Sequence, residues 1–504
     1  MTPAPGPGVL GLAYPFAAAR AGHSPRSFLR GLAANAPFLV VAALLIGTFL
    51  LGGSARAGVQ SLMVLRPLAA LALGYGLWTL RPEHLRRHRV LLALALAVVA
   101  LPLLHLMPLP HAVWSALPGR EQIVAIDRLA GLGQIARPLS LVPDATANAL
   151  LSLLVPMAVL VLGIQLDRPS RKRLVPLIIL LALASATLGV MQLLGPRGGP
   201  LYLYDITNAD SAVGLFANRN HQACLLAMAI PLIALWGTRR GRGPAQRSGP
   251  GTILRRVCAL TAIGMLVPLI LVTGSRAGLL LAAIAILAVA GLLPGWLAQA
   301  QEARARRRGR TTLSRLALPL GLVSLAGLLA MATAFTGRAE AWNRLRLYDP
   351  EDLRFRAFPA AARAAWRYWP AGSGIGSFEA AYQSNEPDAL LAPGLLNHAH
   401  DDWLELVMTG GLPAVILLVT ALAVAIGAIF RVFRPTIPGR AADPHGQVGA
   451  ILLGLVAVAS IGDYPLRTPA IEAIFVIAAI MVTCAVTPQA AIAATGGESA
   501  PRSY

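Results

Sequence analysis

The sequence predicts an all-α polytopic integral membrane protein with about twelve transmembrane helices. Of its 504 residues, 56% are hydrophobic and only 13% are charged, whereas a soluble globular chain carries about 25% charged residues. Apolar runs of about 20 residues, the length that crosses the hydrocarbon core of a bilayer, recur almost from end to end. A transmembrane β-barrel would instead show strands of about 10 residues with alternating hydrophobicity.

We expect residues 1–504 to form a single polytopic membrane domain. Each predicted helix is an apolar segment of about 17–25 residues, bounded by polar or charged loops. The twelve predicted spans are 33–52, 61–80, 90–107, 145–165, 174–194, 221–237, 257–273, 277–298, 316–336, 406–430, 447–463 and 468–487.

The charges on alternate loops predict the orientation of these spans. The segments on the side of the two termini contain 27 Lys and Arg and five acids, whereas the other loops contain 15 Lys and Arg and 17 acids. Because cytoplasmic loops are enriched in Lys and Arg, the tails 1–32 and 488–504 are expected to be cytoplasmic. Loops 108–144, 195–220 and 337–405 are then expected to face outward.

The net charge of +21 does not indicate a nucleic-acid partner, because the basic residues form short clusters between apolar segments. Residues 55–57 read Ala-Arg-Ala, which resembles the cleavage site of a secretory signal. However, about 30 residues precede the first apolar run, and that run has the full length of a span. We therefore favour an uncleaved first span.

The outward-facing loops hold the residues that could carry chemistry. Loop 337–405 contains seven Arg and ten acids, and we expect it to be the only extramembrane segment long enough to form a small substructure. The cytoplasmic loops are short and basic, and none contains the phosphate-binding pattern GxxxxGK[ST]. Chemistry is therefore expected at the outer face, without ATP.

Four outward clusters and a fifth near the end of the chain combine polar, aromatic and glycine residues. They occupy residues 214–221, 273–278, 354–376, 397–411 and 463–467.

Each cluster also has a structural interpretation. Arg276 could anchor a helix at the membrane surface, although an arginine in so short a turn needs an anionic partner such as a ligand. Asn218 and Asn220 could cap the sixth span, and either Asp401 or Asp402 could cap the tenth.

The glycines at 372, 374 and 376 resemble a dinucleotide loop only weakly, because no strand precedes them. His398 and His400 could bind zinc together with the two aspartates that follow them. Two histidines at i, i+2 diverge on a helix, however, so such a site would require an extended segment. We expect no metal site and favour a single functional histidine, since imidazole can accept a proton near neutral pH.

Taken together, the clusters resemble the bacterial family of O-antigen ligases and O-antigen or exopolysaccharide polymerases. The resemblance covers about residues 90 to 487. It rests on four motifs that occur in the family's order, namely NRNH at 218–221, SRAG at 275–278, HAHDDWLELVMTGGLP at 398–413 and DYPLRTP at 463–469.

The resemblance implies a GT-C-like glycosyltransferase of the bacterial inner membrane that needs no cofactor or metal. Members move a glycan from a polyprenyl-diphosphate carrier to an acceptor glycan at the periplasmic face. We favour a polymerase, for which a chain-length regulator is a possible partner. The alternatives are a ligase, whose acceptor is lipid A–core, and a transporter of lipid-linked glycans. A transporter is disfavoured because we find no internal repeat, and because the polar residues gather at one face rather than at the bilayer midplane.

The resemblance also implies roles for individual residues. His400 matches the family's catalytic histidine, although Asp401 stands where an asparagine is usual. Arg276 and Arg354 match its two diphosphate-binding arginines, with Arg356 as an alternative to Arg354. The further substrate-binding candidates are Asn218, Arg219, Asn220, His221, His398 and Asp402.

These roles agree with the chemistry of the expected reaction. Two guanidinium groups can bind a leaving diphosphate bidentately as it gains charge. A neutral histidine can take the proton of the attacking hydroxyl. Attack opposite the leaving group would invert the anomeric centre.

Overall fold

The computed structural model describes residues 25–239, 250–301, 353–391, 396–434 and 442–487. The first half of this part contains α1 (Pro25–Leu51), α2 (Leu62–Thr79), α3 (Pro82–Arg87), α4 (Arg89–Leu106), β1 (Pro108–Leu109), α5 (His111–Trp114), α6 (Glu121–Leu129), β2 (Arg137–Pro138), α7 (Pro143–Ser152), α8 (Leu154–Gly163) and α9 (Arg168–Leu194). The second half contains α10 (Arg219–Gly237), α11 (Pro250–Val272), α12 (Arg276–Gln301), α15 (Leu353–Arg367), α16 (Phe378–Gln383), η2 (Asp388–Leu390), α17 (Asp402–Phe433), α18 (Pro444–Ala459), η3 (Pro465–Arg467) and α19 (Pro469–Val486).

The structure confirms the predicted all-α polytopic membrane fold. Within the described ranges, nine helical segments are long and apolar enough to cross a membrane, and two shorter apolar helices cover Asn35–Leu51 and Pro444–Ala459. These segments correspond to eleven of the twelve predicted spans. The remaining predicted span, 316–336, lies outside the described residues.

Helix α9 extends further toward the N-terminus than the apolar segment predicted as the fifth span, 174–194. Helix α9 begins at Arg168, because Asp167 caps it by accepting a hydrogen bond from the Ser170 N–H at 2.9 Å. The basic residues of this first turn were interpreted as loop. They lie instead on a helix that continues beyond its apolar part.

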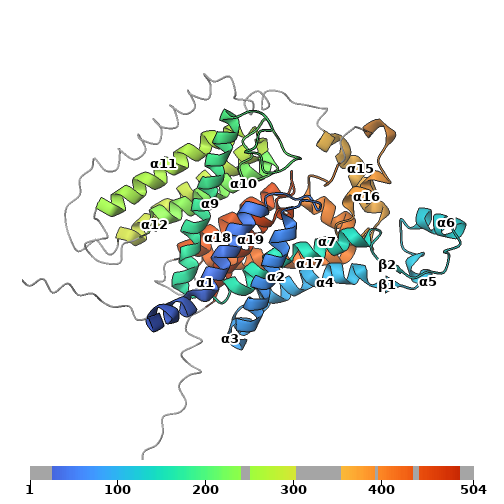
Figure 1. Ribbon diagram of the computed structural model, residues 1–504, viewed down its shortest axis with the longest axis horizontal. Coiled ribbons are helices and arrows are strands. Elements are labelled where there is room, and N and C mark those ends of the chain that lie inside the picture. Colours follow the sequence, from blue (N-terminus) through green and yellow to red (C-terminus); the bar gives the residue numbers. More distant parts are fainter. Residues whose placement is uncertain (1–24, 240–249, 302–352, 392–395, 435–441, 488–504) are drawn as a thin grey trace, which may run out of the picture.

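Helix α10 lies at the centre of the helix bundle, with almost all of its residues buried among α9, α11, α12 and α18 (Figure 1). A Cβ atom on Gly278 of α12 would lie 2.3 Å from that of Ala223, and one on Gly237 would lie 2.7 Å from that of Ala259 in α11. Small residues therefore let neighbouring helices approach closely. Such contacts replace the hydrophobic driving force that is absent between helices in lipid.

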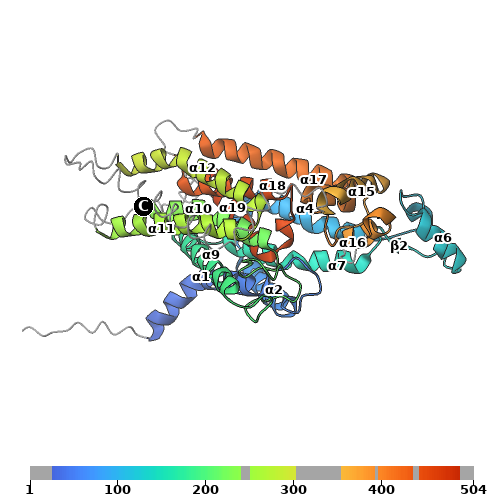
Figure 2. The same cartoon turned by 90° about the horizontal axis from the view of Figure 1, so that it is seen from above.

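Helix α18 makes contacts at both ends of the bundle. Near its start, Gln447 accepts a hydrogen bond from the Trp296 indole of α12 at 2.6 Å. Just past its other end, Ser460 donates to Asp402 at the start of α17. The end at which α10, α12, α17 and α19 begin, which we call the site end, therefore lies opposite the C-terminal part of α12. Figure 2 shows α15 and α16 at the site end.

A break in α17 explains the glycines of loop 370–377. At Gly411 the backbone has φ 61° and ψ −156°, so the helix is interrupted there. The loop pairs with this break through hydrogen bonds from Gly374 N to Thr409 O at 2.8 Å and from Leu412 N to Pro370 O at 2.9 Å. A Cβ on Gly372 would lie 2.6 Å from the Thr409 oxygen. These glycines thus allow the loop to pack against helix backbone, which accounts for them without a dinucleotide.

The expectation that only loop 337–405 forms an extramembrane substructure was wrong. Residues 108–138 also form a small lobe, in which β1 pairs antiparallel with β2 and α5 and α6 lie between them. Arg120 anchors this lobe, since its fully buried guanidinium donates to the carbonyls of Pro118, Leu139 and Gly372 at 2.8–3.0 Å. Burial lowers the pKa of Arg120 to about 10, which leaves the group charged near neutral pH.

Candidate active site

The site is built around the first turn of α17. Asp401 caps this helix, because its Oδ1 accepts the backbone N–H groups of Trp403 at 2.9 Å and Leu404 at 3.0 Å. The preceding residue, His400, has a positive φ of 51°, so the chain turns sharply into the helix. An asparagine oxygen can serve as the same cap, so the departure from the family's usual residue at this position preserves a structural function.

Glu405 lies one turn into α17 and is almost completely buried. Both of its carboxylate oxygens lie 3.1 Å from Nδ1 of His398, and Oε2 also accepts the N–H of Ala399 at 3.1 Å. Since a carboxylate only accepts hydrogen bonds, Nδ1 of His398 is the donor. Glu405 therefore fixes both the segment before α17 and the His398 ring.

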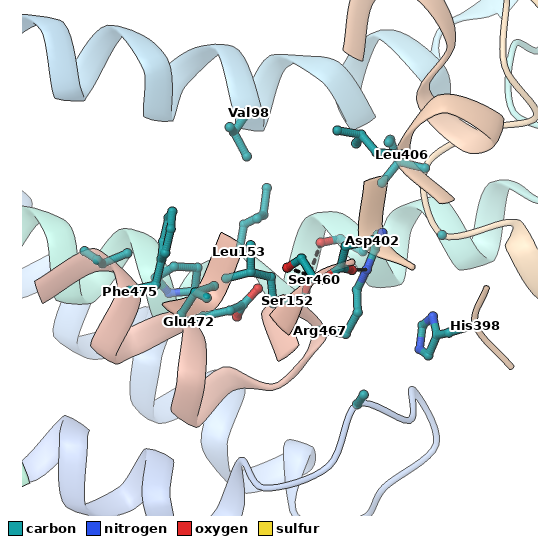
Figure 3. A pocket seen from close by; sticks show the side chains of 18 of the residues that line it. Val98, Ser152, Leu153, His398, Asp402, Leu406, Ser460, Arg467, Glu472 and Phe475 are labelled. Carbon is teal, nitrogen blue, oxygen red and sulfur yellow. Dashed lines mark hydrogen bonds and ion pairs between the residues drawn. The ribbon is translucent and has the colours of Figure 1, made fainter. Parts of the chain in front are cut away.

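Arg467, from η3, joins Glu405 to a second carboxylate. Its Nη2 lies 3.3 Å from Glu405 Oε1, and its Nε donates to Asp402 Oδ1 at 3.2 Å. Asp402 Oδ2 also accepts the Ser460 hydroxyl at 3.1 Å (Figure 3). Burial alone would lower the pKa of Arg467, but the Glu405 and Asp402 carboxylates outweigh it and raise this pKa above its ordinary value.

A second group of polar side chains surrounds the buried carboxylate of Asp463. His400 Nδ1 lies 3.5 Å from Asp463 Oδ1, and His221 Nε2 lies 3.8 Å from the same oxygen. Asn220 donates to Asp463 Oδ2 at 2.5 Å. The other ring nitrogen of His221 is hydrogen-bonded to the Thr468 hydroxyl at 2.8 Å. This carboxylate therefore faces one histidine from α10 and one from the segment just before α17.

The Tyr464 ring lies in contact with both groups. Its centroid is 4.4 Å from that of His398, 4.8 Å from that of His400 and 5.2 Å from that of His221. One aromatic ring thus packs against three histidines that the sequence places in two separate motifs. This packing restricts the orientation of the imidazole rings.

Two cavities meet at these side chains. The larger, about 1550 Å³, extends along α4, α7, α8, α17, α18 and α19, and most of its lining is apolar. At the site end its lining changes to polar groups that include His398, Asp402, Arg467 and Glu472 (Figure 3). It is thus an apolar groove between candidate membrane-spanning helices, with a charged end.

The smaller cavity, about 190 Å³, lies beside His400, His221 and Tyr464. The two cavities share a rim of five lining residues, which are Ser54, Ala55, Arg56, Ile206 and Asn397. A molecule in the larger cavity can therefore extend to the edge of the smaller one. Arg56 is the arginine that lines both.

The structure brings most of the predicted site residues together at the site end. His221, His398, His400, Asn220 and Asp402 take part in the contacts described above. Asn218 lines the smaller cavity and also caps α10, because it accepts the N–H of Asn220 at 2.9 Å. The capping interpretation thus applies to Asn218 and to Asp401, whereas Asn220 and Asp402 use their side chains for contacts with other segments.

Two of the predicted arginines lie away from the two cavities. Arg276 begins α12 and is exposed, and neither it nor Arg219 is among the residues that line the two cavities. A Cβ on Gly274 would lie 3.8 Å from Nη1 of Arg219, so the NRNH and SRAG segments are neighbours. Arg354 lies in the first turn of α15, where the structure describes the backbone only.

Sequence reasoning assigned no role to five residues of this site. They are Arg56, Glu405, Asp463, Tyr464 and Arg467. Glu405 offered a signal, because it directly precedes the predicted span 406–430, and an acid so close to the membrane is costly unless it has a partner. Asp463, Tyr464 and Arg467 belong to the DYPLRTP motif, which the sequence singled out without indicating its partners. Arg56 was considered only as part of a signal-cleavage pattern.

No group of three or more His, Cys, Asp and Glu side chains is arranged to hold a metal ion in the described ranges. His398 and His400 face different carboxylates, Glu405 and Asp463 respectively. The zinc site considered from the sequence, with both histidines as ligands, therefore has no counterpart among these residues.

Comparison with known protein families identifies the central part of the chain. Residues 260–419 match the family described as O-antigen ligase. This segment extends from α11 into α17 and includes Arg276, Arg354, His398 and His400. The match confirms the resemblance for the segment that contains the motifs at 275–278 and 398–413, whereas the motifs at 218–221 and 463–469 lie outside it. No curated protein is similar enough to the chain to count as a match.

Proposed function

We propose that this membrane protein, which carries an O-antigen ligase domain at residues 260–419, is a glycosyltransferase that moves a glycan from a polyprenyl-diphosphate carrier to an acceptor glycan. The observation that carries the proposal is the apolar groove between candidate membrane-spanning helices that ends among charged and histidine side chains. A polyprenyl diphosphate matches this groove, because it has a long apolar chain and an anionic end.

The donor needs no nucleotide, because its sugar–phosphate bond is already activated. As that bond breaks, the leaving diphosphate gains negative charge, which guanidinium groups can stabilise bidentately. We assign this role to Arg276 and Arg354 because they match the family's arginines, although Arg276 lines neither cavity. Arg56, at the rim of the groove, is placed to add positive charge near the sugar–phosphate bond. The reaction then requires no divalent metal.

His400 is the proposed general base. Its Nδ1 faces Asp463, which leaves Nε2 to take the proton of the acceptor hydroxyl. The nearby carboxylate would stabilise the imidazolium that forms, as the aspartate does in other histidine-based sites. General-base catalysis of this kind contributes about 10²–10⁴-fold to rate. Attack on the face opposite the diphosphate would invert the anomeric centre.

The proposed location is the periplasmic face of the bacterial inner membrane, with both termini in the cytoplasm. The distribution of charged loops supports this orientation. It can be tested by labelling single cysteines with an impermeant reagent in cells with a permeabilised outer membrane. We expect labelling at Ser384→Cys but not at Gly309→Cys, and the reverse pattern would contradict the orientation.

The favoured activity is that of a polysaccharide polymerase, with another carrier-linked repeat as the acceptor. The second candidate is a ligase that uses lipid A–core, since the matched family is described as O-antigen ligase. Deleting the gene distinguishes the two. A polymerase mutant should accumulate single carrier-linked repeats, whereas a ligase mutant should accumulate carrier-linked polymer. Transfer by purified protein in detergent, with both glycans supplied, would exclude a pure transporter.

A further inference from the structure

The smaller cavity has a lining that the chemistry of the donor does not explain. Its volume of about 190 Å³ is below the range of about 300–1,000 Å³ for sites that hold drug-sized ligands. It lies beside His400, whereas the polyprenyl chain would occupy the larger cavity. Among its lining residues Arg56 is the only Lys or Arg, and none is a carboxylate.

Two asparagines of this cavity have a fixed orientation. The side-chain oxygen of Asn208 accepts the N–H of Arg219 at 3.0 Å, and that of Asn218 accepts the N–H of Asn220 at 2.9 Å. The oxygen of each carboxamide is thus engaged by backbone, and the NH₂ group remains as the donor. Both side chains therefore offer hydrogen-bond donors to whatever fills the cavity.

The rest of the wall combines aromatic and aliphatic residues with the polar Ser54, Thr207 and Asn397. Tyr464 contributes its ring, and Ala55, Ala217 and Ile206 contribute aliphatic groups. A pyranose needs this combination, because its hydroxyl oxygens accept hydrogen bonds while its C–H face packs on aromatic and aliphatic surface. With Arg56 and two amide groups as donors and no acid, the lining also suits a sugar that carries a carboxylate.

We propose that the smaller cavity binds the terminal sugar of the acceptor glycan, an inference that rests on the proposed glycosyl transfer. The shared rim at Arg56 and Asn397 would bring the donor's anomeric carbon to the edge of this cavity. The acceptor oxygen forms the new bond to that carbon and gives its proton to His400. The bond from the anomeric carbon to the phosphate oxygen breaks, and its electron pair leaves with the diphosphate.

Ala217 offers a side chain through which the cavity can be filled. Its backbone is held by hydrogen bonds to Gly53 O at 3.0 Å and from the Thr207 hydroxyl at 2.9 Å, and the residue lines the cavity. Ala217→Phe should therefore fill the proposed subsite while leaving the donor groove open. Ala421→Phe is the matched control, because Ala421 lines only the larger cavity.

The experiment uses full-length protein in detergent. The donor is the carrier-linked glycan extracted from cells that lack this chain, and the variable acceptor is the same repeat released from its carrier. Three quantities are measured, namely glycan transfer, binding of polyprenyl diphosphate, and the slow release of polyprenyl diphosphate by water. We expect Ala217→Phe to lower transfer by about tenfold or more and to leave the other two unchanged. Ala421→Phe should weaken the binding of polyprenyl diphosphate.

Two results would overturn the proposal. In one, Ala217→Phe transfers glycan as well as the wild type. In the other, it loses transfer and polyprenyl-diphosphate binding in parallel, which would assign the cavity to the donor. If Ala217→Phe does not insert, Ala217→Val carries the same test and should raise the KM for the acceptor. A wild-type protein that binds polyprenyl diphosphate but never transfers glycan would instead refute the proposed function itself.

Discussion

Nδ1 of His400, at the start of α17, lies 3.5 Å from Oδ1 of Asp463, between α18 and α19. The contact joins two segments that are 63 positions apart in the sequence. In the proposed mechanism it distinguishes the two nitrogens of the ring, because Nδ1 faces a buried carboxylate and Nε2 is assigned to the acceptor hydroxyl. The Asp463 carboxylate would then stabilise the imidazolium that forms.

His400→Ala should lower turnover by about 10²-fold or more, while the binding of polyprenyl diphosphate is retained. The reason is that the imidazole acts on the acceptor and not on the donor. Asp463→Asn should lower turnover in the same direction but less severely, because the ring remains and only the charge that stabilises its protonated form is lost. Steady-state kinetics and donor binding of purified variants would measure both effects.

His398→Ala is the informative comparison, since His398 also faces a carboxylate, that of Glu405. We expect His398→Ala to lower turnover less than His400→Ala does. An inactive His398→Ala beside an active His400→Ala would move the catalytic role to His398. If both variants were active, no histidine of this motif would be the base. Each variant must first be shown to insert at the wild-type level.

Arg276→Lys should weaken the binding of polyprenyl diphosphate, because lysine keeps the charge but cannot form the bidentate contact. Arg354→Ala should weaken it more, since the charge is lost as well. Arg356→Ala is the matched control. Arg356 is exposed and its Nη2 donates to the Ala389 carbonyl at 3.3 Å, so we expect a smaller effect. If Arg356→Ala weakened the binding of polyprenyl diphosphate more than Arg354→Ala does, Arg356 would be the diphosphate-binding arginine in place of Arg354.

The contact between Glu405 and Arg467 should matter for stability as well as for activity. Arg467→Gln leaves two buried carboxylates without their cation, and breaking a buried ion pair in this way costs about 3–5 kcal/mol. Glu405→Gln should also lower the unfolding temperature. The double variant should be less destabilised than the sum of the two, because each single change strands the partner's charge. Thermal unfolding in detergent of the wild type, the two single variants and the double variant measures this coupling. Strictly additive losses of stability would argue against a shared network.

Gly411→Ala should destabilise the protein. The backbone at this position has φ 61° and ψ −156°, a conformation that is essentially restricted to glycine and costs other residues about 1–3 kcal/mol. The new Cβ would also lie 2.3 Å from the Pro370 oxygen. Gly427→Ala in the same helix is the control, and it should be neutral or slightly stabilising. Equal unfolding temperatures for the two variants would contradict the proposed role of the helix break.

Glycan transfer should persist in the presence of EDTA, because arginine side chains supply the positive charge that metal ions provide in other transferases. The assay is the transfer reaction with and without chelator. Activity that EDTA abolishes and Mg²⁺ or Mn²⁺ restores would disprove metal independence. Asp402 would then be the first ligand to suspect, since Asp401 is engaged as a helix cap.

The sequence by itself determined the fold class and the position of almost every span in the described ranges. Both depend on local composition, because each helix must present about 20 apolar residues to the bilayer. The sequence also determined which short motifs matter, including those that contain His400 and Asp402. It missed the lobe at 108–138, because the burial of Arg120 against Gly372 is a contact between distant segments.

Only the tertiary structure decided how the polar residues pair. Each histidine could have faced solvent, a metal or any of several acids. The packing of α10, α17 and the segment between α18 and α19 instead places His398 against Glu405, and His221 and His400 against Asp463. It also brings Arg56, from the loop after α1, to the rim shared by the two cavities. Apart from the pair His398 and Glu405, these contacts join segments 63 or more residues apart. No local pattern of residue types encodes which distant side chain will fill a given place.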